Sequence, residues 1–153
     1  KKKSIQIAIE VIEKVSERIH SQFAPQINKE VSELIKKITN ERYTNIKIDD
    51  KLGISVENPN TREIVPLDSL SGGTIDQIHF SLRYSIINSM EKENFPLILD
   101  DCFIQYDDTR LENILRYLDE ISDNVQILLF TCHNREKDIL DRLNLKYNFI
   151  NIS

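Results

Sequence analysis

Glycine is scarce in this sequence, because only three glycines, Gly53, Gly72 and Gly73, occur among its 153 residues. A phosphate-cradling P-loop needs glycines spread over a GxxxxGKS/T stretch. No such stretch is present. The sequence therefore excludes a complete nucleotide site of this type within the chain.

Long hydrophobic runs are also missing. No apolar stretch approaches the roughly 18–20 residues that span a bilayer, and nothing at the start reads as a signal peptide, so no membrane segment is expected. The two cysteines, Cys102 and Cys132, have no metal-type spacing, and free thiols in a reducing cytoplasm are expected. The chain opens with Lys1 rather than Met, from which we expect a fragment of a longer protein.

Positive charge is too sparse for a nucleic-acid-binding surface over the whole chain, because the net charge is −5. The charge is uneven, with +3 on residues 1–42 and −8 on the rest. DNA contact therefore stays open for the first segment. The composition, 40% hydrophobic and 29% charged, indicates one soluble globular domain with a helical bias.

Residues 4–42 have a helical pattern. Apolar residues spaced three and four apart, as in a coiled-coil seam, come first: Ile5, Ala8, Ile12, Val15 and Ile19. Pro25 is expected to interrupt the run, because a proline inside a helix loses a hydrogen bond and clashes with the preceding turn. The pattern then resumes at Ile27, Val31, Leu34 and Ile38. It indicates either one arm of an antiparallel coiled coil entering a globular body or an ordinary pair of amphipathic helices packed on a sheet.

Short strands follow, and then helices alternate with strands. Strand-like segments at 43–48, 52–57 and 63–67 predict a short antiparallel β section. From residue 68 onward, helices are expected at 74–91, 108–121 and 135–143, and strands at 96–100, 125–131 and about 147–152. This alternation predicts an α/β fold whose parallel sheet is flanked by helices and binds ligands at the carboxyl ends of its strands.

The run at residues 70–74, which reads LSGGT, opens the first of these helices. Its two glycines allow a ligand close to the backbone, and Ser71 offers a hydroxyl beside the free N–H groups and the positive dipole end of the helix. These features predict an anion site. An N-terminal cap without a ligand is the alternative interpretation of the same residues.

Two adjacent carboxylates, Asp100 and Asp101, end a buried apolar strand. Carboxylates side by side need a cation or a protonated partner, and Mg²⁺ fits because it takes oxygen ligands and keeps most of its waters. Neighbouring residues point to opposite faces of a strand, so one carboxylate would serve the metal and the other would lie near an attacking water. A helix cap or turn after the strand is the alternative.

Asp107 and Asp108 begin the second helix of this alternation, and capping explains one of these acids but not both. His133 directly follows another buried strand. A lone histidine is more often a structural group, but in a parallel sheet His133 would emerge at the same carboxyl edge as Asp100 and Asp101. These side chains would then lie within reach of one ligand.

The order of these runs resembles the motifs of ATP-binding-cassette (ABC) ATPases, in the form found in SMC, SbcC and RecF-type heads. Residues 70–77 resemble the signature motif, 97–101 the Walker B strand, 104–107 the D-loop and 128–133 the switch-histidine strand. Residues 23–43 resemble the junction between arm and head in SbcC-like proteins. The resemblance covers essentially the whole chain, and the sequence looks most like the bacterial YhaN-like group of SbcC relatives.

The resemblance implies a role for each motif residue. Asp100 would hold Mg²⁺ through its water shell, and Asp101 would polarise the attacking water. His133 would contact the γ-phosphate of ATP, and Asp107 would link two active sites across a homodimer. The signature residues would bind the ATP held by the opposite subunit: Ser71, Gly72, Gly73, Thr74 and Gln77.

Two residues depart from the family's pattern. Asp101 stands where Glu is usual and is one methylene shorter, so hydrolysis would be slow or would use a different water position. Thr74 stands where Gln or Glu is common, which we expect to matter less because the backbone and Ser71 do most of the phosphate binding.

The resemblance also implies where the ATPase motifs that this sequence lacks would lie. Walker A and the Q-loop would lie in an N-terminal lobe of the same protein, residues 1–42 would end a coiled-coil arm, and residues 43–153 would form the C-terminal lobe of the head. Two ATPs would join two heads, and hydrolysis would release them, whereas this chain alone would bind ATP poorly. The implied substrate is DNA, and the implied process is DNA repair or processing. A nuclease subunit is an implied partner, and the implied location is the cytoplasm or the nucleoid.

Two other classes of protein compete with this interpretation. An ABC-like module could bind ATP to dimerise but hardly turn it over, acting as a structural clamp. A phospho-receiver signalling domain also places an acidic pair after a buried strand, but it needs another Asp and then a Lys at later strand ends. No suitably placed Lys follows Asp101. We therefore expect an ATPase head.

Overall fold

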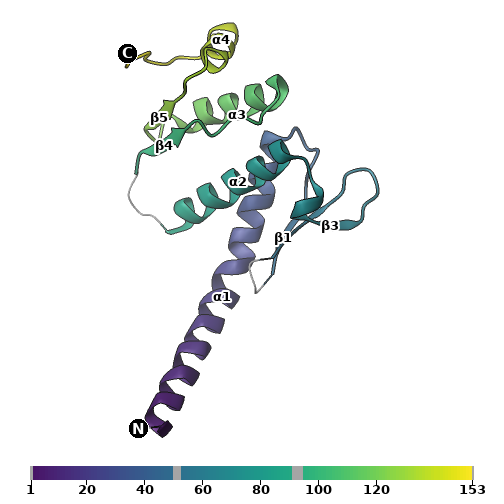
Figure 1. Ribbon diagram of the computed structural model, residues 1–153, viewed down its shortest axis with the longest axis vertical. Coiled ribbons are helices and arrows are strands. Elements are labelled where there is room, and N and C mark those ends of the chain that lie inside the picture. The colour runs from purple at the N-terminus through teal and green to yellow at the C-terminus, as the bar shows by residue number, and fades with distance from the viewer. Residues whose placement is uncertain (1, 50–52, 91–94, 153) are drawn as a thin grey trace.

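The computed structural model describes residues 2–49, 53–90 and 95–152, without the side chains of residues 2–4, 8, 13, 16–24 and 90. A long helix leads into a small α/β body (Figure 1). The helices are α1 (Lys2–Ile38), α2 (Gly72–Met90), α3 (Asp108–Ile121) and α4 (Arg135–Arg142), with a 3₁₀ turn at Leu67–Ser69. The strands are β1 (Ile46–Ile48), β2 (Ile54–Glu57), β3 (Ile64–Pro66), β4 (Leu97–Asp100) and β5 (Ile127–Phe130).

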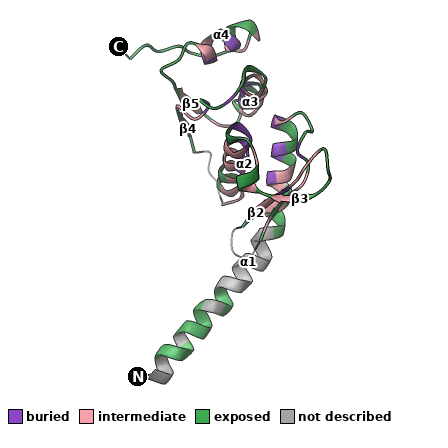
Figure 2. Cartoon of the chain, turned by 45° about the vertical axis from the view of Figure 1, so that its right-hand side comes forward, coloured by how far each residue is buried: buried purple, intermediate pink, exposed green. Residues whose placement is uncertain are grey.

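Helix α1 has an anchored half and a projecting half. The anchored half buries one stripe with the spacing of an amphipathic helix: Val31, Leu34, Ile35 and Ile38. The other half projects away from the body (Figure 2), and its described apolar side chains are all exposed: Ile5, Ile7, Ile9, Val11, Ile12 and Val15. Ala8 and Ile19 of the predicted seam lie outside the described side chains. Among the described residues, no helix combines the length and the apolar character needed to cross a membrane.

The expected interruption at Pro25 is wrong, as is the expected end of this helix at residue 42. Helix α1 runs unbroken through Pro25. The proline is exposed, and the loss of one hydrogen bond bends or weakens a long helix without necessarily ending it. The helix ends at Ile38 because Asn40 and Glu41 adopt left-handed backbone, with φ of 51° and 62°, which closes the last turn.

Strands β1, β2 and β3 form an antiparallel sheet, which confirms the predicted β section. Val56 in the middle strand is opposite Ile46 on one side and Val65 on the other. Ile46 and Val56 are buried, so this sheet is held to the body by one face. The strands are shorter than expected, and Leu52, where the second was expected to start, lies outside the described residues.

Strands β4 and β5 pair in parallel, from Leu97 opposite Ile127 to Asp100 opposite Phe130. This pairing, with α3 connecting the two strands, confirms the predicted α/β fold with a parallel sheet.

The further strand expected near 147–152 is wrong, because residues 145–152 form neither helix nor strand. Within the described pairings, no strand lies beside this segment to accept its hydrogen bonds. Its apolar side chains consequently remain exposed, with Phe149 at 63% and Ile150 at 77%.

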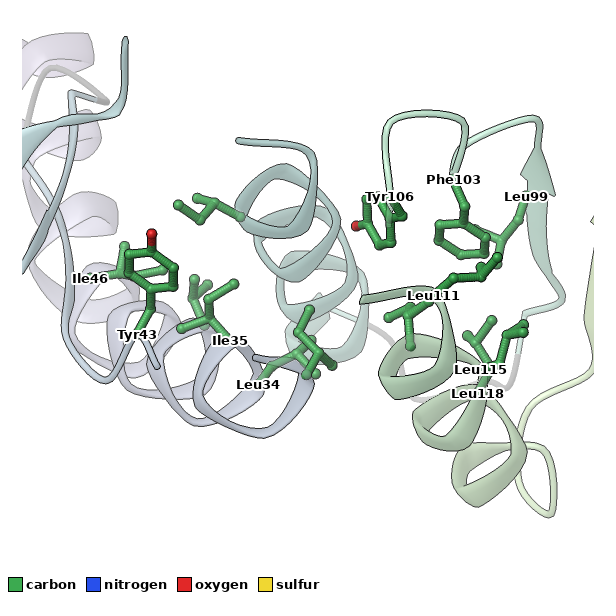
Figure 3. Close-up of a cluster of buried hydrophobic side chains, with 14 of the residues drawn as sticks. Leu34, Ile35, Tyr43, Ile46, Leu99, Phe103, Tyr106, Leu111, Leu115 and Leu118 are labelled. Atoms are coloured by element: carbon green, nitrogen blue, oxygen red, sulfur yellow. The ribbon is translucent and has the colours of Figure 1, made fainter. Parts of the chain in front are cut away.

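The buried hydrophobic side chains form one core cluster, part of which is shown in Figure 3. Helix α1 and the segment that leads from it into β1 contribute Leu34, Ile35, Tyr43 and Ile46. Helix α3 and the strand β4 with its following loop contribute Leu99, Phe103, Leu111, Leu115 and Leu118. Helix α2 contributes the fully buried Ile78. Each such side chain stabilises the fold by about 1.5–3 kcal/mol, so the start of α2 and the loop after β4 are anchored on one core.

Candidate functional site

The signature turn, residues 70–74, begins helix α2. The helix starts at Gly72 rather than at residue 74 as expected, because the Ser71 carbonyl accepts the N–H groups of Thr74 at 2.9 Å and Ile75 at 3.0 Å. The Ser71 hydroxyl lies 2.9 Å from Thr74 Oγ1. Ser71 is exposed, whereas Thr74 is fully buried. The Ser71 hydroxyl therefore stands at the surface beside the positive end of a 19-residue helix, as an anion site requires.

The 103–107 loop, which contains the predicted D-loop, packs directly on the signature turn. A Cβ atom at Gly73 would lie 2.8 Å from the Gln105 carbonyl oxygen, too close for real atoms. At Gly72, a Cβ atom would meet only the side-chain end of Gln105, which can move. Neither glycine has a positive φ. Gly73 is thus required by the close approach of this loop rather than by its own backbone conformation.

Arg110, in the first turn of α3, connects the 103–107 loop to the signature turn. Its guanidinium forms an ion pair with Asp107 and donates from Nε to Gln77 Oε1 at 3.3 Å. Nη2 donates to Thr74 Oγ1 at 3.2 Å and to Ser71 Oγ at 3.4 Å. The Arg110 side chain is only 22% exposed. One half-buried cation therefore contacts the predicted D-loop carboxylate and three of the predicted signature residues.

Asp107 caps helix α3, which identifies the one of the two adjacent acids that capping explains. Its Oδ1 accepts the Arg110 backbone N–H at 2.9 Å. That hydrogen bond, followed by the Arg110 charge, holds the pKa of the Asp107 carboxyl below its ordinary value. Asp107 is consequently ionised, and its side chain remains 54% exposed.

Gln77 lies in the interior rather than at the surface. It is 1% exposed, and its Nε2 donates to the carbonyl of Ile38 at 3.2 Å, at the end of α1. Its Oε1 accepts from Arg110. Both polar atoms of the Gln77 side chain therefore have hydrogen-bond partners within the protein. This geometry favours a structural contact between α2 and α1. The role of Gln77 in nucleotide binding stays a prediction.

The predicted carboxylate pair lies at the end of β4. Asp100 is the last residue of the strand and is exposed. The backbone N–H of Asp101 donates to the Phe130 carbonyl at 2.9 Å, which extends the ladder to β5. Asp101 has a φ of 45°, in the left-handed region that Asp occupies more readily than most residues. This turn of the backbone directs its Oδ1 to the backbone N–H of Cys132, at 3.2 Å.

The His133 turn, residues 131–134, follows β5 at the same edge. The backbone N–H of His133 donates to Thr131 Oγ1 at 3.1 Å, and that hydroxyl donates to Glu136 Oε2 at 3.1 Å. Glu136 is 3% exposed, whereas His133 is exposed. Because Asp101 bonds to Cys132, the structure brings Asp101 and the His133 turn together, as the parallel sheet predicted.

The residues at this edge fit a magnesium ion that takes most of its ligands from water and phosphate. Among the residues that the structure describes, no three His, Cys, Asp or Glu side chains could hold a metal by themselves. Burial raises the pKa of the Cys102 thiol to about 11 and also raises that of Cys132, so neither is a thiolate at neutral pH. Asp100 is exposed and offers oxygen ligands, and one or two carboxylates are what Mg²⁺ uses beside a nucleotide.

An open cleft of about 620 Å³ lies between α2 and β4. Asp100 and Asp101 line its polar part together with Asp76 and His79 of α2. Its apolar part includes Ile98, which is 62% exposed. The carboxylate pair therefore faces space that a ligand or another part of a protein can enter.

Two arginines were missed by the sequence analysis. Arg110 follows the cap Asp107 by three residues, a spacing at which helical side chains meet, so the sequence held a signal for it. Arg135 begins α4 and donates to the carbonyl oxygens of Tyr106 at 2.8 Å and Phe103 at 2.9 Å. No local spacing predicts this contact, because the partners are about thirty residues away in the chain and meet only in the fold.

No family model matches this chain. Its sequence is 29% identical over 140 residues to the uncharacterized protein YhaN of Bacillus subtilis (strain 168). The matched region covers 88% of this chain but only 14% of that relative. The chain therefore spans only about a seventh of the length of this relative.

Solved structures of SMC heads have the same fold. A structure from work on ATP-driven dimerization and DNA-stimulated activation of SMC ATPases matches 82% of this chain and 78% of its own, with a TM-score of 0.65 and 16% identity. The Smc head of Pyrococcus furiosus, with an extended coiled coil and bound to the C-terminal domain of ScpA, matches 90% of this chain and 36% of its own (TM-score 0.62, 18% identity). The SMC head domain of Thermotoga maritima matches 81% of this chain and 43% of its own (TM-score 0.59, 21% identity). The chain therefore has the α/β fold of an SMC ATPase head domain, which confirms the resemblance on which its motifs were assigned.

Proposed function

We propose that this chain is the C-terminal half of an SMC/SbcC-like ATPase head that binds and hydrolyses ATP between two head subunits. The observation that carries the proposal is the meeting of Asp100, Asp101 and the His133 turn at one edge of a parallel strand pair, in a chain with an SMC-head fold. Ligands bind at such carboxyl edges in α/β sheets.

The edge at the carboxyl ends of β4 and β5 supports the roles proposed for Asp100, Asp101 and His133. Asp100 would hold Mg²⁺ through water, and Asp101 would orient the attacking water. His133 is exposed at the same edge and would contact the γ-phosphate. When bound, Mg²⁺ neutralises the phosphate charge, and the protein's own part is to position these three groups.

The signature turn supports the second set of roles. Ser71 is exposed at the positive end of α2, where the first N–H groups of the helix favour a phosphate. It would bind the γ-phosphate of ATP held by the other head. Asp107, ionised and half exposed beside it, would contact the partner's site across the dimer.

A second lobe would complete the sheet. The face of β4 and β5 exposes Ile98 at 62%, Leu128 at 39% and Phe130 at 40%. A parallel pair of strands with an uncovered apolar face is unstable alone, because parallel sheets are normally larger and covered on both faces. An N-terminal lobe of the same protein would cover this face and supply the Walker A loop that this sequence lacks.

The wider setting rests on the resemblance. The arm, residues 1–42, carries a charge of +3, and residues 43–153 would form the lobe that closes on ATP. We propose DNA as the substrate that the full-length protein handles, in repair or processing, with a nuclease subunit as a further partner. The proposed place of action is the cytoplasm, at the nucleoid.

ATP-dependent dimerisation tests this proposal. Light scattering of this chain paired with its Walker A lobe should give dimers only when ATP and Mg²⁺ are present. Ser71→Arg should abolish them, because a long cationic side chain would fill the phosphate position. Ser122→Arg, at an exposed position after α3, is the matched control and should leave the dimers intact. A folded and lobe-paired mixture that forms no ATP-dependent dimer would reduce the signature turn to a helix cap.

A clamp that dimerises on ATP but hardly hydrolyses it is the second candidate, and the geometry of Asp101 favours it. The Asp101 carboxylate is short, and its Oδ1 already accepts the Cys132 N–H. An oxygen held in this way is less available to an attacking water. The substitution Asp101→Glu separates the two candidates in the lobe-paired protein: ATP turnover should rise if the natural head is a clamp and fall if Asp101 is already adjusted for hydrolysis.

A further inference from the structure

The 103–107 loop contacts both parts of the candidate site. On one side, the Gln105 carbonyl lies against Gly73 of the signature turn, with no room for a Cβ atom between them. On the other side, the loop follows β4 and Asp101, which bonds to the His133 turn. A loop packed this tightly transmits a displacement of either neighbour, because close-packed atoms have little free space to absorb it.

Arg135 fixes the loop from the side of the His133 turn. It lies two residues after His133, at the start of α4. Its Nη1 donates to the Tyr106 carbonyl at 2.8 Å and its Nη2 to the Phe103 carbonyl at 2.9 Å. Both are charge-assisted hydrogen bonds at short distance, the stronger kind. The backbone of the loop is therefore tied to the turn that carries His133.

Arg110 fixes the same loop from the side of the signature turn. It pairs with Asp107 at the end of the loop and reaches the side-chain oxygens of Gln77, Thr74 and Ser71. Gln77 in turn donates to the last carbonyl of α1, that of Ile38. These contacts continue the link from the loop to Ser71 and to the end of the arm.

On the basis of the function proposed above, we propose that Arg110 and Arg135 are positioning residues that join the His133 turn, the 103–107 loop and the signature turn into one unit. A change at His133 in one nucleotide site then moves Ser71 and Asp107, which serve the nucleotide of the partner head. The two arginines act through the residues they hold, and neither needs to touch the nucleotide.

Arginine suits both positions because its planar fork can hold several acceptors at fixed angles. Arg135 uses two nitrogens for two carbonyl oxygens, and Arg110 uses three for four side chains. Lysine would keep the charge beside Asp107 but could not span Ser71, Thr74 and Gln77 at once. This difference separates positioning from a simple contribution of positive charge.

The test uses the full-length protein with Arg110→Gln, Arg135→Gln, the double variant and Arg110→Lys. Arg116→Gln is the matched control, because Arg116 lies on α3 and forms an exposed pair with Glu112. Three quantities are measured: ATP affinity at protein concentrations too low for dimers, ATP-dependent dimerisation by light scattering, and kcat. Thermal unfolding reports any general loss of stability.

We expect each single Gln variant to bind ATP with unchanged affinity but to lose about tenfold in dimer affinity and in kcat, the effect of losing hydrogen bonds to a charged group. The double variant should be little worse than either single one, because both arginines act on one loop. Arg110→Lys should recover only part of the loss, and Arg116→Gln should match the wild type.

Several results would overturn this inference. They are wild-type dimerisation and kcat in both single variants, additive losses in the double variant, full recovery by Arg110→Lys, and a fall in melting temperature that accounts for the whole loss. These outcomes are distinct from failure of the proposed function, in which the wild-type protein itself forms no dimer with ATP.

Discussion

At the scale of single residues, the two glycines of the signature turn show that a motif can be recognised from the sequence although the structural need for each residue cannot. Gly72 and Gly73 are adjacent, and from the sequence both are explained in the same way, as making room for a ligand close to the backbone. In the fold, Gly73 makes room for the carbonyl of Gln105, whereas Gly72 faces the movable end of the Gln105 side chain. Gln105 lies 32 residues after Gly73 in the chain, so no local sequence pattern could predict this contact.

Gly73→Ala should therefore be costly. The added methyl group would meet a backbone oxygen that cannot move without displacing the 103–107 loop. The expected loss in the free energy of unfolding is about 1–3 kcal/mol, the usual cost of overpacking. Gly72→Ala is the matched control and should be nearly neutral, since alanine favours the first turn of a helix. Urea denaturation of the two variants measures the difference, and equal stability would mean that the loop does not pack on Gly73.

Tyr106 offers a test in which the substitution is expected to maintain or raise stability rather than lower it. The residue is 2% exposed, its hydroxyl has no hydrogen-bond partner in the described structure, and burial raises its pKa well above the ordinary value. Tyr106→Phe should leave stability unchanged or raise it by about 1 kcal/mol, because the variant no longer buries an unpaired polar group. Tyr147→Phe, which removes an exposed hydrogen bond to Asp141, should lower stability slightly. A clear loss on Tyr106→Phe would instead reveal a partner for the hydroxyl.

At the scale of elements, the sequence predicted α3 with its observed bounds, because both of its signals are local. Asp107 caps it, and an apolar stripe follows that the structure buries: Leu111, Ile114, Leu115 and Leu118. The errors occurred where the outcome depends on tertiary context. Pro25 was expected to break α1 but sits on an exposed side of a long helix, and the segment at 147–152 has strand-like residues but no described strand to pair with.

The cap of α3 makes a prediction about pH. The pKa of Asp107 is lowered in the folded protein from its ordinary value of 3.8, chiefly by the Arg110 N–H. A lowered folded pKa stabilises the protein fully above the unfolded value, and this contribution is lost as pH falls through the folded value. Asp107→Asn should therefore reduce stability by a few tenths to about 1 kcal/mol at pH 7, a size that allows for the exposure of the side chain.

The difference between wild type and Asp107→Asn should stay constant from pH 7 to about pH 4 and shrink below it. Asp108→Asn, in the same helical turn, is the control and should have less effect, because the Arg110 contacts belong to Asp107. Chemical denaturation across this range checks both variants. A difference that persists unchanged well below pH 4 would show that the charge of Asp107 contributes nothing.

At the scale of the whole molecule, the sequence placed Asp100, Asp101 and His133 at one edge because parallel strands end together. It did not find Arg110 and Arg135, which join that edge to the signature turn. The distinction is physical: strand ends are fixed by topology, whereas the arginine contacts depend on how α3 and α4 pack around one loop. The candidate groups were thus accessible to sequence reasoning, and the connections between them were not.

The uncovered sheet face gives the prediction that tests the assembly of the head. Ile98 on β4 is 62% exposed and lines the cleft beside Asp100 and Asp101, where we expect the Walker A lobe to pack. Ile98→Lys places a charge in that contact and should abolish pairing of the two lobes, measured by co-purification and light scattering. Ile64→Lys is the matched control, because Ile64 is 49% exposed on β3 of the other sheet and should leave pairing intact. Because both positions are already exposed, neither substitution should unfold the chain, so a normal pairing of Ile98→Lys would show that the lobe packs elsewhere.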